Sequence, residues 1–369
     1  MTMCKAQYYQ QAVSLLKALI QTPSVSKKED KTAQLLLDYY DKHHIKAKCV
    51  GNNIISHNRC YHPDKPTILL VSHHDTVPPS ESYTKDPFKP EIIGNKLYGL
   101  GANDAGGALV SLLMCYQYFY NDANLPFNLV FCAAAEEEIS GKNGLEKALP
   151  QIGKVDFAIV GEPTSMQMAI SEKGLMVCDC VAYGQSGHAA RNEGDNAIFK
   201  AISDIQWLKS YCFEKTSSTL GEVKMTPTVI HAGSKHNVVP DHCEFVVDVR
   251  TTDAYDNKAV LAIMKANMQS VITPRSMRIE PTRVPLEHPV VKSLMAYGLP
   301  GYGSPTTSDQ AVLTCPSVKL SPGDSARSHT ADEFIYLEQI KEGVAFFIDF
   351  FTQLKTEDVF NSKKSLAHN

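Results

Sequence analysis

Side chains that bind divalent metals gather in four short segments of this 369-residue chain. The segments are His73-His74-Asp75, Glu136-Glu137-Glu138, Gly161-Glu162-Pro163-Thr164 and the stretch that ends at His329. The apolar runs that precede them, each typical of a buried strand, are residues 67–72, 127–134, 156–160 and 317–320. Imidazole and carboxylate groups suit zinc and other divalent ions. Since ligands of open α/β sheets bind beyond the carboxyl ends of the strands, we expect the four segments to meet in one crevice.

Each segment alone is a weaker signal than the four together. The pairing of His73 with Asp75 is also common at protein surfaces, and three consecutive glutamates ordinarily mark a solvated face. Here the glutamates directly follow Phe-Cys-Ala-Ala-Ala, where burial is predicted. Adjacent carboxylates near a core repel each other unless a cation compensates them. The combination therefore indicates a metal site.

Helices and strands alternate in the first half of the chain. Residues 1–20 predict an amphipathic helix, and Ser26-Lys27-Lys28-Glu29 predicts a capping box that opens a second helix. Residues 105–118 predict another helix, with Asp104 at or near its N-cap. This alternation favours an α/β fold, in which a doubly wound, mostly parallel sheet is covered by helices on both faces.

The middle of the chain follows a different order of elements. The predicted strands are residues 174–183, 227–232, 243–249 and 277–279, and the predicted helices are residues 196–208 and 257–268. Their order, β-α-β-β-α-β, is that of a ferredoxin-like α+β module. We expect residues 174–281 to form a domain inserted into a catalytic domain of residues 1–173 and 282–369. A last helix is indicated by apolar residues at spacings of three and four, namely Leu337, Ile340, Val344, Phe347, Phe351 and Leu354.

The composition of the chain limits the partners that the protein is expected to bind and the cellular compartment in which it is expected. The formal charge is −4 and no basic run occurs, so nucleic acid is not an expected partner. No apolar run is long enough to cross a membrane and no secretory leader is evident, which predicts a cytoplasmic protein without membrane association. The ten cysteines are scattered, which favours reduced thiols. Cys178 and Cys180 are predicted to face the core from one strand.

Seven motifs, in order and over nearly the whole chain, resemble those of the aminoacylase and carboxypeptidase G2-like family of two-zinc hydrolases. This family includes acetylornithine deacetylase and succinyl-diaminopimelate desuccinylase. The motifs are Ser72-His73-His74-Asp75-Thr76-Val77-Pro78, Tyr98-Gly99-Leu100-Gly101-Ala102-Asn103-Asp104, Ala135-Glu136-Glu137-Glu138, Gly161-Glu162-Pro163-Thr164, Ser186-Gly187-His188-Ala189-Ala190, Asn237-Val238-Val239-Pro240 and Gly323-Asp324-Ser325-Ala326-Arg327-Ser328-His329-Thr330.

The resemblance implies a set of ligands for two zinc ions. His73, Asp104 and Glu162 would hold one ion, and His329, Glu138 and the shared Asp104 would hold the other. Cobalt or manganese could replace zinc at sites so rich in oxygen ligands. Paired metals lower the pKa of a bridging water and polarise a scissile carbonyl, which is the chemistry of amide hydrolysis.

The resemblance also implies roles for residues around the metals. Asp75 would accept a hydrogen bond from the second ring nitrogen of His73 and fix its tautomer. Glu137 would be the general base that moves the water's proton to the leaving amine. His188, in the inserted domain, would reach the active site of a neighbouring subunit, so the inserted lid domain would also form a homodimer. The alternative for His188 is packing beneath the first helix of the inserted domain.

Arg250 is a candidate for gripping a substrate carboxylate with two hydrogen bonds. It ends a predicted strand, and its alternative role is a salt bridge at the surface. The resemblance implies that Asn237 assists from the same domain. Ser308 and Asp309 are expected to line the pocket.

Within the family, the pattern is most similar to acetylornithine deacetylase. The implied reaction is hydrolysis of N2-acetyl- or N2-succinyl-L-ornithine to ornithine and a carboxylic acid, as in arginine synthesis. Desuccinylation of diaminopimelate, dipeptide cleavage, general aminoacylase activity and a catalytically silent metabolite-binding role are the alternatives. Two departures weaken the transfer of specificity: Asp104-Ala105-Gly106-Gly107 lacks the lysine that many relatives carry, and Glu172-Lys173-Gly174 replaces His-Lys-Gly.

Overall fold

A computed structural model describes residues 4–355 and divides the chain into two compact units. The first unit contains the residues up to Ile170, Val284–Tyr302 and the residues from Ser308 onward. The second contains Ser171–Arg283 and Gly303–Thr307. The segment Gly303–Thr307 was expected in the catalytic domain, but its strand residue Gly303 packs closely on Thr219 and Leu220 of the second unit.

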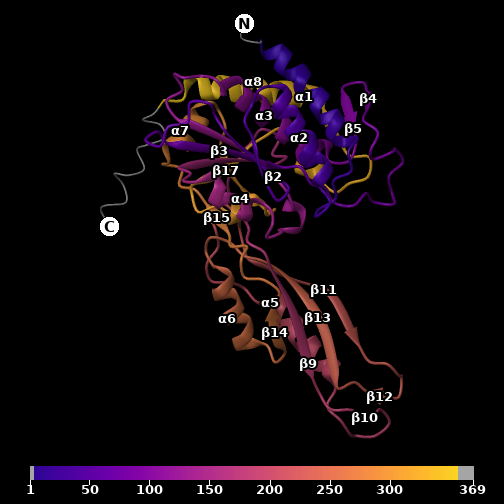
Figure 1. Cartoon of the computed structure of the whole chain (residues 1–369). Helices are drawn as coiled ribbons and strands as arrows, with labels where there is room; N and C mark the ends of the chain where they lie inside the picture. Colours follow the sequence, from indigo (N-terminus) through magenta and orange to yellow (C-terminus); the bar gives the residue numbers. More distant parts are fainter. Residues whose placement is uncertain (1–3, 356–369) are drawn as a thin grey trace. The chain divides into compact units, whose positions relative to one another are not determined.

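The first unit is built on a sheet with a parallel centre and antiparallel edges (Figure 1). Its strands are β1 (Lys48–Val50), β2 (Asn53–His57), β3 (Thr67–His73), β6 (Asn128–Ala134), β7 (Phe157–Gly161), β8 (Met168–Glu172) and β17 (Ser317–Lys319). Their order is β1-β2-β6-β3-β7-β17-β8, and β6, β3, β7 and β17 run parallel. Every residue of β3, β6 and β7 is buried, as expected for parallel strands covered on both faces. The predicted mixed α/β fold with a mostly parallel sheet is confirmed.

Helices cover both faces of this sheet. They are α1 (Lys5–Ile20), α2 (Asp30–Lys42), α3 (Gly107–Phe119), α4 (Leu145–Ile152), α7 (Pro289–Ala296) and α8 (Leu337–Gln353). Alternate residues of β3 point to opposite sides, so that Ile68 and Leu70 join one apolar cluster with α1, α3 and α8. Leu69 and Val71 join a second cluster with α4. The last helix was predicted correctly, while the first three residues of the predicted first helix lie outside the described residues.

Two predicted helix starts are wrong. Helix α2 has Glu29 as its N-cap, but neither Glu29 nor Ser26 caps the helix with its side chain, because both side chains bind other loops. Helix α3 begins at Gly107, two residues later than expected. Asp104 is therefore not its N-cap and lies in a preceding turn, η1 (Ala102–Gly106), where its φ of −120° and ψ of 100° are not helical.

Short elements complete the first unit. A small antiparallel sheet, in the order β18-β5-β4, joins β4 (Glu91–Ile93), β5 (Lys96–Tyr98) and β18 (Phe334–Tyr336). The strand β16 (Gly301–Ser304) begins in the first unit, ends in the second and pairs with β8. The remaining short helices of the first unit are η2 (Glu137–Ile139), η3 (Asp309–Val312) and η4 (Ser325–Arg327). The turns η1, η2 and η4 carry or adjoin the predicted metal ligands.

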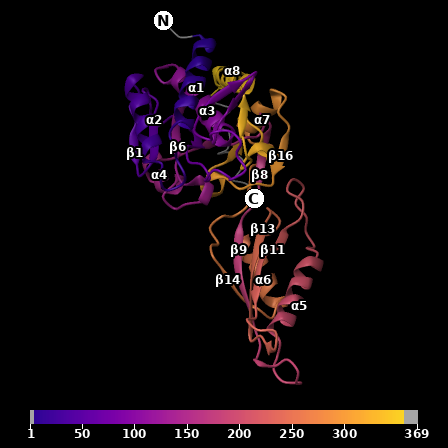
Figure 2. The same ribbon diagram turned by 90° about the vertical axis from the view of Figure 1, so that its right-hand side faces the viewer.

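The second unit is an antiparallel sheet with two helices against one face (Figure 2). Its elements are β9 (Met176–Tyr183), α5 (Ala197–Ser210), β11 (Lys224–Ala232), β13 (His242–Arg250), α6 (Asn257–Asn267) and β14 (Val271–Pro274), with the short strands β10 (Gly187–His188), β12 (Val238–Val239) and β15 (Thr282–Arg283). The sheet order is β11-β13-β9-β14. The element order β-α-β-β-α-β is the one that ferredoxin-like modules have.

One predicted strand of the second unit is misplaced. The fourth strand is β14 (Val271–Pro274), which pairs with β9, whereas Ile279 forms only an isolated bridge with Leu175. The prediction for the two cysteines holds: Cys178 and Cys180 are buried free thiols in the core of this unit.

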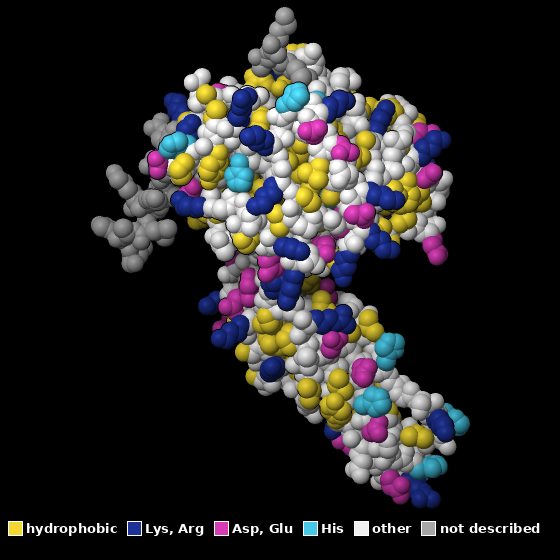
Figure 3. All heavy atoms as spheres, viewed as in Figure 1, with side chains coloured by type: hydrophobic (Ala, Val, Ile, Leu, Met, Phe, Trp, Pro, Cys, Tyr) yellow, Lys and Arg dark blue, Asp and Glu magenta, His cyan; other side chains and the backbone are white. Residues whose placement is uncertain are grey.

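On the face drawn in Figure 3, lysine and arginine side chains are interspersed with acidic ones. Among residues 4–355, no helix has the length and apolar character needed to span a bilayer.

Candidate metal centre

The parallel strands of the first unit bring the predicted ligands to one edge of the sheet. His73 is the last residue of β3, the three glutamates follow β6, and Glu162 follows β7. Because these strands are adjacent and parallel, their carboxyl ends lie side by side. Asp104 arrives from the turn before α3, and His329 from the loop after η4.

Distances show that all five predicted ligands lie together. The Nε2 atom of His73 lies 3.2 Å from Oδ1 of Asp104 and 4.0 Å from Oε1 of Glu162. The Nε2 atom of His329 lies 2.8 Å from Oε2 of Glu138 and 3.9 Å from Oδ2 of Asp104. The two oxygens of Asp104 are thus the ones nearest the two different histidines. Ligand atoms of His73, Asp104 and Glu138 all lie within 4.8 Å of one another.

Glu137, the predicted base, lies in the same cluster. Its Oε2 atom is 3.8 Å from Nε2 of His73, and ligand atoms of His73, Glu137 and Glu162 also lie within 4.8 Å of one another. Its side chain is 12% exposed. A group in this place can exchange a proton with a molecule bound between the ligands.

Crowding of carboxylates perturbs their charges. Burial, together with the neighbouring Glu162 carboxylate, raises the pKa of Glu137 well above its ordinary value. Burial also raises the pKa of Glu162 to about 8, although His73 and the buried Lys319 oppose the rise. Carboxyl groups this close retain protons unless positive charge compensates them. The donor set therefore fits one or more divalent cations.

The two histidines are held by carboxylates. A hydrogen bond with Glu138 raises the pKa of His329 to about 9. Burial disfavours the charged form of His73, but hydrogen bonds with Asp104 and Asp75 raise its pKa well above the ordinary value. Cations bound to these nitrogens would take the place of the protons, because a metal ligand must be a neutral imidazole.

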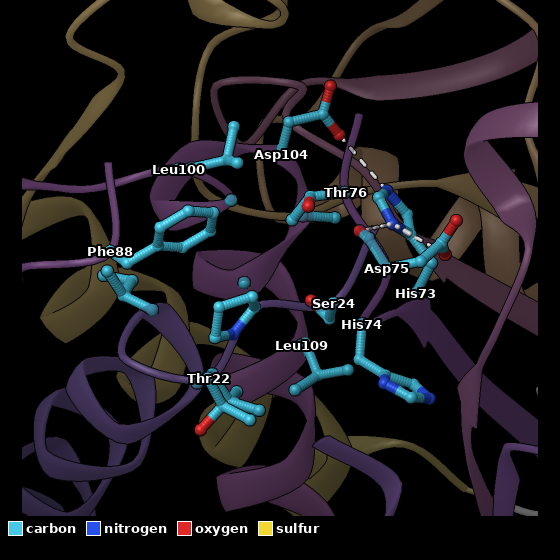
Figure 4. Close-up of a pocket in the computed structure, with 16 residues that line it drawn as sticks. Thr22, Ser24, His73, His74, Asp75, Thr76, Phe88, Leu100, Asp104 and Leu109 are labelled. Atoms are coloured by element: carbon cyan, nitrogen blue, oxygen red, sulfur yellow. Dashed lines mark hydrogen bonds and ion pairs between the residues drawn. The ribbon is translucent and has the colours of Figure 1, made fainter. Parts of the chain in front are cut away.

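Asp75 has more contacts than the sequence predicted. The Nδ1 atom of His73 lies 3.0 Å from the main-chain oxygen of Asp75, and 3.5 Å from its Oδ1 atom (Figure 4). The closest acceptor is thus the backbone and not the carboxylate. The carboxylate instead accepts hydrogen bonds from Ser26 and from the backbone amides of Glu137 and Glu138. Asp75 therefore joins the first histidine to the glutamate loop, which consists of residues 135–144 between β6 and α4.

An apolar pocket borders the first histidine. Figure 4 shows Phe88, Leu100 and Leu109 around a space that His73 and Asp104 also line. Apolar walls lower the local dielectric and strengthen the electrostatic interactions of the ligands. Gly106 lies in the same wall, and a Cβ atom there would come within 2.4 Å of the Gly101 oxygen. A side chain at position 106 would therefore require Gly101 or Leu16 to shift.

Two buried ionisable residues of the site were not predicted. Glu333 is 2% exposed and accepts hydrogen bonds from the backbone amides of Gly101, Asn103 and Asp104. Burial raises its pKa to about 8. Lys319 is 1% exposed at the end of β17, a strand that pairs with β7. No periodicity marks these residues, and only the charge within an apolar run, Ser317-Val318-Lys319-Leu320, was a signal.

Ser308 and Asp309 have separate roles in the first unit. Ser308 caps the short helix η3 by accepting a hydrogen bond from the Gln310 amide. Asp309 is buried and contributes to the raised pKa values of Glu137 and Glu162. Asp309 therefore belongs to the electrostatic surroundings of the site.

Three predicted residues belong to the second unit. His188 in β10 is exposed and pairs with Val238 of β12. The neighbouring amide of Ala189 donates to the Asn237 oxygen at 3.0 Å, so Asn237 lies directly beside this short ladder. His188 does not pack in the core beneath helix α5, which was its alternative. Arg250 forms two hydrogen bonds with Asp248, at 2.8 and 3.1 Å, and its Nη1 atom lies 3.5 Å from Oγ1 of Thr307.

The sequence profile of peptidase family M20/M25/M40 matches residues 69–353. A [LysW]-lysine/[LysW]-ornithine hydrolase of Sulfurisphaera tokodaii is 27% identical, covering 86% of this chain and 89% of the relative. The acetylornithine deacetylase of Pectobacterium carotovorum is also 27% identical, covering 89% and 94%. That of Yersinia pseudotuberculosis is 29% identical, covering 78% and 80%.

Solved structures share the fold. The aminopeptidase PepT of Bacillus cereus superimposes with a TM-score of 0.75 at 18% identity, covering 94% of this chain and 99% of that one. An M20 family metallo-carboxypeptidase of Sulfolobus solfataricus gives a TM-score of 0.72 at 18% identity, covering 92% and 98%. A dinuclear metal-binding peptidase of Bacillus subtilis gives 0.66 at 15% identity, covering 94% and 98%.

Proposed function

Because the chain belongs to peptidase family M20/M25/M40, we propose that this hydrolase cleaves the amide bond of an N-acyl amino acid with the help of two zinc ions. The observation that carries the proposal is the cluster of two histidines and four carboxylates at one sheet edge. The named relatives that act on acylated ornithine support the substrate class.

The ligands would divide between the two cations as the sequence motifs imply. His73, Asp104 and Glu162 would hold one, and His329, Glu138 and Asp104 the other. The placement of the two Asp104 oxygens near different histidines supports this division. When bound, the cations would polarise the scissile carbonyl and lower the pKa of a water molecule. Cobalt or manganese are alternative occupants.

Glu137 would move the proton in this reaction. Its carboxylate lies among the ligands, and its raised pKa favours acceptance of a proton from water and its later release to the leaving amine. Asp75 would fix His73 and the glutamate loop. Apolar side chains beside His73 would exclude bulk water from the ligands.

The second unit would act as a ferredoxin-like lid and dimerisation domain. His188 is exposed on a short ladder and free to contact substrate bound in a neighbouring subunit, where it would stabilise an oxyanion. Arg250 would bind the substrate carboxylate, although this would require Asp248 to share or release the guanidinium. Asn237 would assist His188 from the position before the facing strand β12.

The most specific substrate proposal is N2-acetyl- or N2-succinyl-L-ornithine, which would place the enzyme in arginine synthesis in the cytoplasm. The test is release of free ornithine from each compound by the native protein and by Glu137→Ala, with metal content measured. Release that is lost in the variant while two metals remain supports the substrate and the mechanism. Bound metal without release from either compound overturns the substrate, and diaminopimelate derivatives, dipeptides and other acyl amino acids would then be assayed.

A further inference from the structure

Four consecutive backbone amides of the glutamate loop are held by side chains from three other segments. The Ala135 amide donates to Oδ1 of Asn53 at 3.0 Å, and the Glu136 amide donates to Oε1 of Glu29 at 3.3 Å. The amides of Glu137 and Glu138 donate to Oδ1 and Oδ2 of Asp75, at 3.1 and 3.2 Å. Every amide from residue 135 to 138 is therefore fixed from outside the loop.

We propose that Glu29 and Asn53 are positioning residues for the base: they hold the main chain ahead of Glu137, as Asp75 holds it at Glu137 and Glu138. This proposal rests on the proposed function, in which Glu137 carries out the proton transfer. Neither Glu29 nor Asn53 belongs to the proposed ligands, and both act through the backbone of the loop.

Glu29 is a fully buried carboxylate whose hydrogen bonds all come from loop residues. It is 0% exposed, and besides the Glu136 amide it accepts hydrogen bonds from the Lys27 amide at 2.6 Å and from Nδ2 of Asn52 at 3.0 Å. A buried carboxylate requires several hydrogen bonds to replace its hydration. Each of these donors belongs to a loop, so the carboxylate ties three loop segments together.

The capping rule that the local sequence satisfies does not hold at the start of helix α2. Ser26 and Glu29 have the spacing of a capping box, yet helix α2 begins without a side-chain cap. Ser26 donates its hydroxyl to Asp75 at 2.7 Å, and Glu29 accepts from the glutamate loop. Side chains that leave a locally favoured role for a distant contact are expected where function sets the geometry.

The loop needs such support because its backbone is unusual. Glu136 has a φ of +54° and Ser140 a φ of +48°, so both adopt the left-handed conformation that non-glycine residues rarely occupy. The Glu136 side chain accepts hydrogen bonds from Asn143, whose backbone oxygen accepts from Nδ2 of Asn53. Asn53 therefore supports the loop at both of its ends.

Loss of this support should displace Glu137 more than the metals, because four of the five proposed ligands lie outside the loop: His73, Asp104, Glu162 and His329. A misplacement of about 1 Å in a reacting group can lower the rate about 100-fold. We expect Glu29→Ala to lower kcat at least about tenfold with KM and metal content near the native values. Glu29→Gln keeps an oxygen for the Glu136 amide but turns an NH2 group towards Asn52, so its kcat should lie between those of Glu29→Ala and the native protein.

The experiment compares Glu29→Ala, Glu29→Gln and Asn53→Ala with the control Asp30→Asn in the metal-loaded, full-length protein. Asp30 is exposed one residue further on, so the control removes the same charge without touching the loop. Steady-state kinetics use N2-acetyl- and N2-succinyl-L-ornithine. Amide hydrogen exchange of the peptide covering residues 133–140 is the second readout, and it requires no turnover.

Faster exchange of residues 133–140 in Glu29→Ala and Asn53→Ala, with partial recovery in Glu29→Gln and none of the change in Asp30→Asn, supports the positioning role. Unchanged exchange in that peptide overturns it, and so does a kcat equal to that of the native protein. If the native protein hydrolyses neither compound, the substrate assignment fails while the exchange data still decide the proposal. If Glu29→Ala does not fold, Glu29→Gln and Asn53→Ala supply the same comparison.

Discussion

The proposed functional residues of the two compact units differ in how firmly they are held. In the first unit, His73 and Asp75 are each 1% exposed, and their hydrogen bonds are satisfied by neighbouring loops. In the second unit, His188 is exposed on a ladder of two residue pairs, and Asn237 is exposed directly before the facing strand β12. The difference teaches that the metal centre is organised by the folded first unit itself. We propose that the residues of the second unit reach a catalytic position only when a substrate or a partner subunit contacts them.

The largest effect is expected from removal of the proposed base. Glu137→Ala should lower kcat by about 100- to 10,000-fold, because general base catalysis contributes on that scale. Metal content should remain at the native value, since Glu137 is not a proposed ligand. Steady-state kinetics and elemental analysis measure both quantities. Near-native activity in the variant would remove Glu137 from the mechanism.

Removal of the metals should affect the two units unequally. A bound cation at a thousandfold excess over its Kd adds about 4 kcal/mol to the free energy of unfolding. A chelator should therefore lower the Tm of the first unit and speed amide exchange in residues 133–140. Exchange in the second-unit strands β9 and β13 should change little. Equal destabilisation of both units would contradict the expectation that the metals stabilise mainly the first unit.

His188→Ala should lower kcat about 100-fold, the effect of losing one oxyanion donor, without loss of metal. His242→Ala is the matched control, because His242 is an exposed histidine of the same unit. Mixing inactive Glu137→Ala and His188→Ala proteins tests whether His188 acts in the active site of the neighbouring subunit. Recovered activity in the mixture supports action of His188 across subunits, whereas no recovery in refolded mixed dimers argues that it acts within its own chain.

The smallest expected effect is a change with pH in the stability of the metal-free protein. In the folded state the pKa of Glu162 is raised to about 8, and that of the largely exposed His329 to about 9. Both groups bind protons more tightly in the folded than in the unfolded chain, so stability should fall as pH rises. The fall should begin near pH 5 for Glu162 and extend from pH 6.5 to 9 for His329. Thermal unfolding across pH 5 to 9 measures it, and the metal-loaded protein should lack this decline.

The sequence by itself determined the parallel sheet and the segments that supply the ligands. It also determined the alternation of helices and strands in the first unit and the β-α-β-β-α-β order in the second. Apolar runs such as residues 67–72 have the length of a strand and are too short for a helix, so they indicate buried strands. Once parallel strands are adjacent, the residues at their carboxyl ends must lie together, and the distances among His73, Glu137 and Glu162 agree with this.

Only the tertiary structure decided what the loops and helix starts do. Ser26 and Glu29 satisfy a local capping rule, yet the buried amides of residues 136–138 and the Asp75 carboxylate offered partners that compete with the helix end. Glu333 and Lys319 were missed because a buried charge is explained by its distant partner and not by its neighbours in sequence. Local patterns fix elements because they act over a few residues, whereas hydrogen-bond partners far apart in the chain meet only after folding.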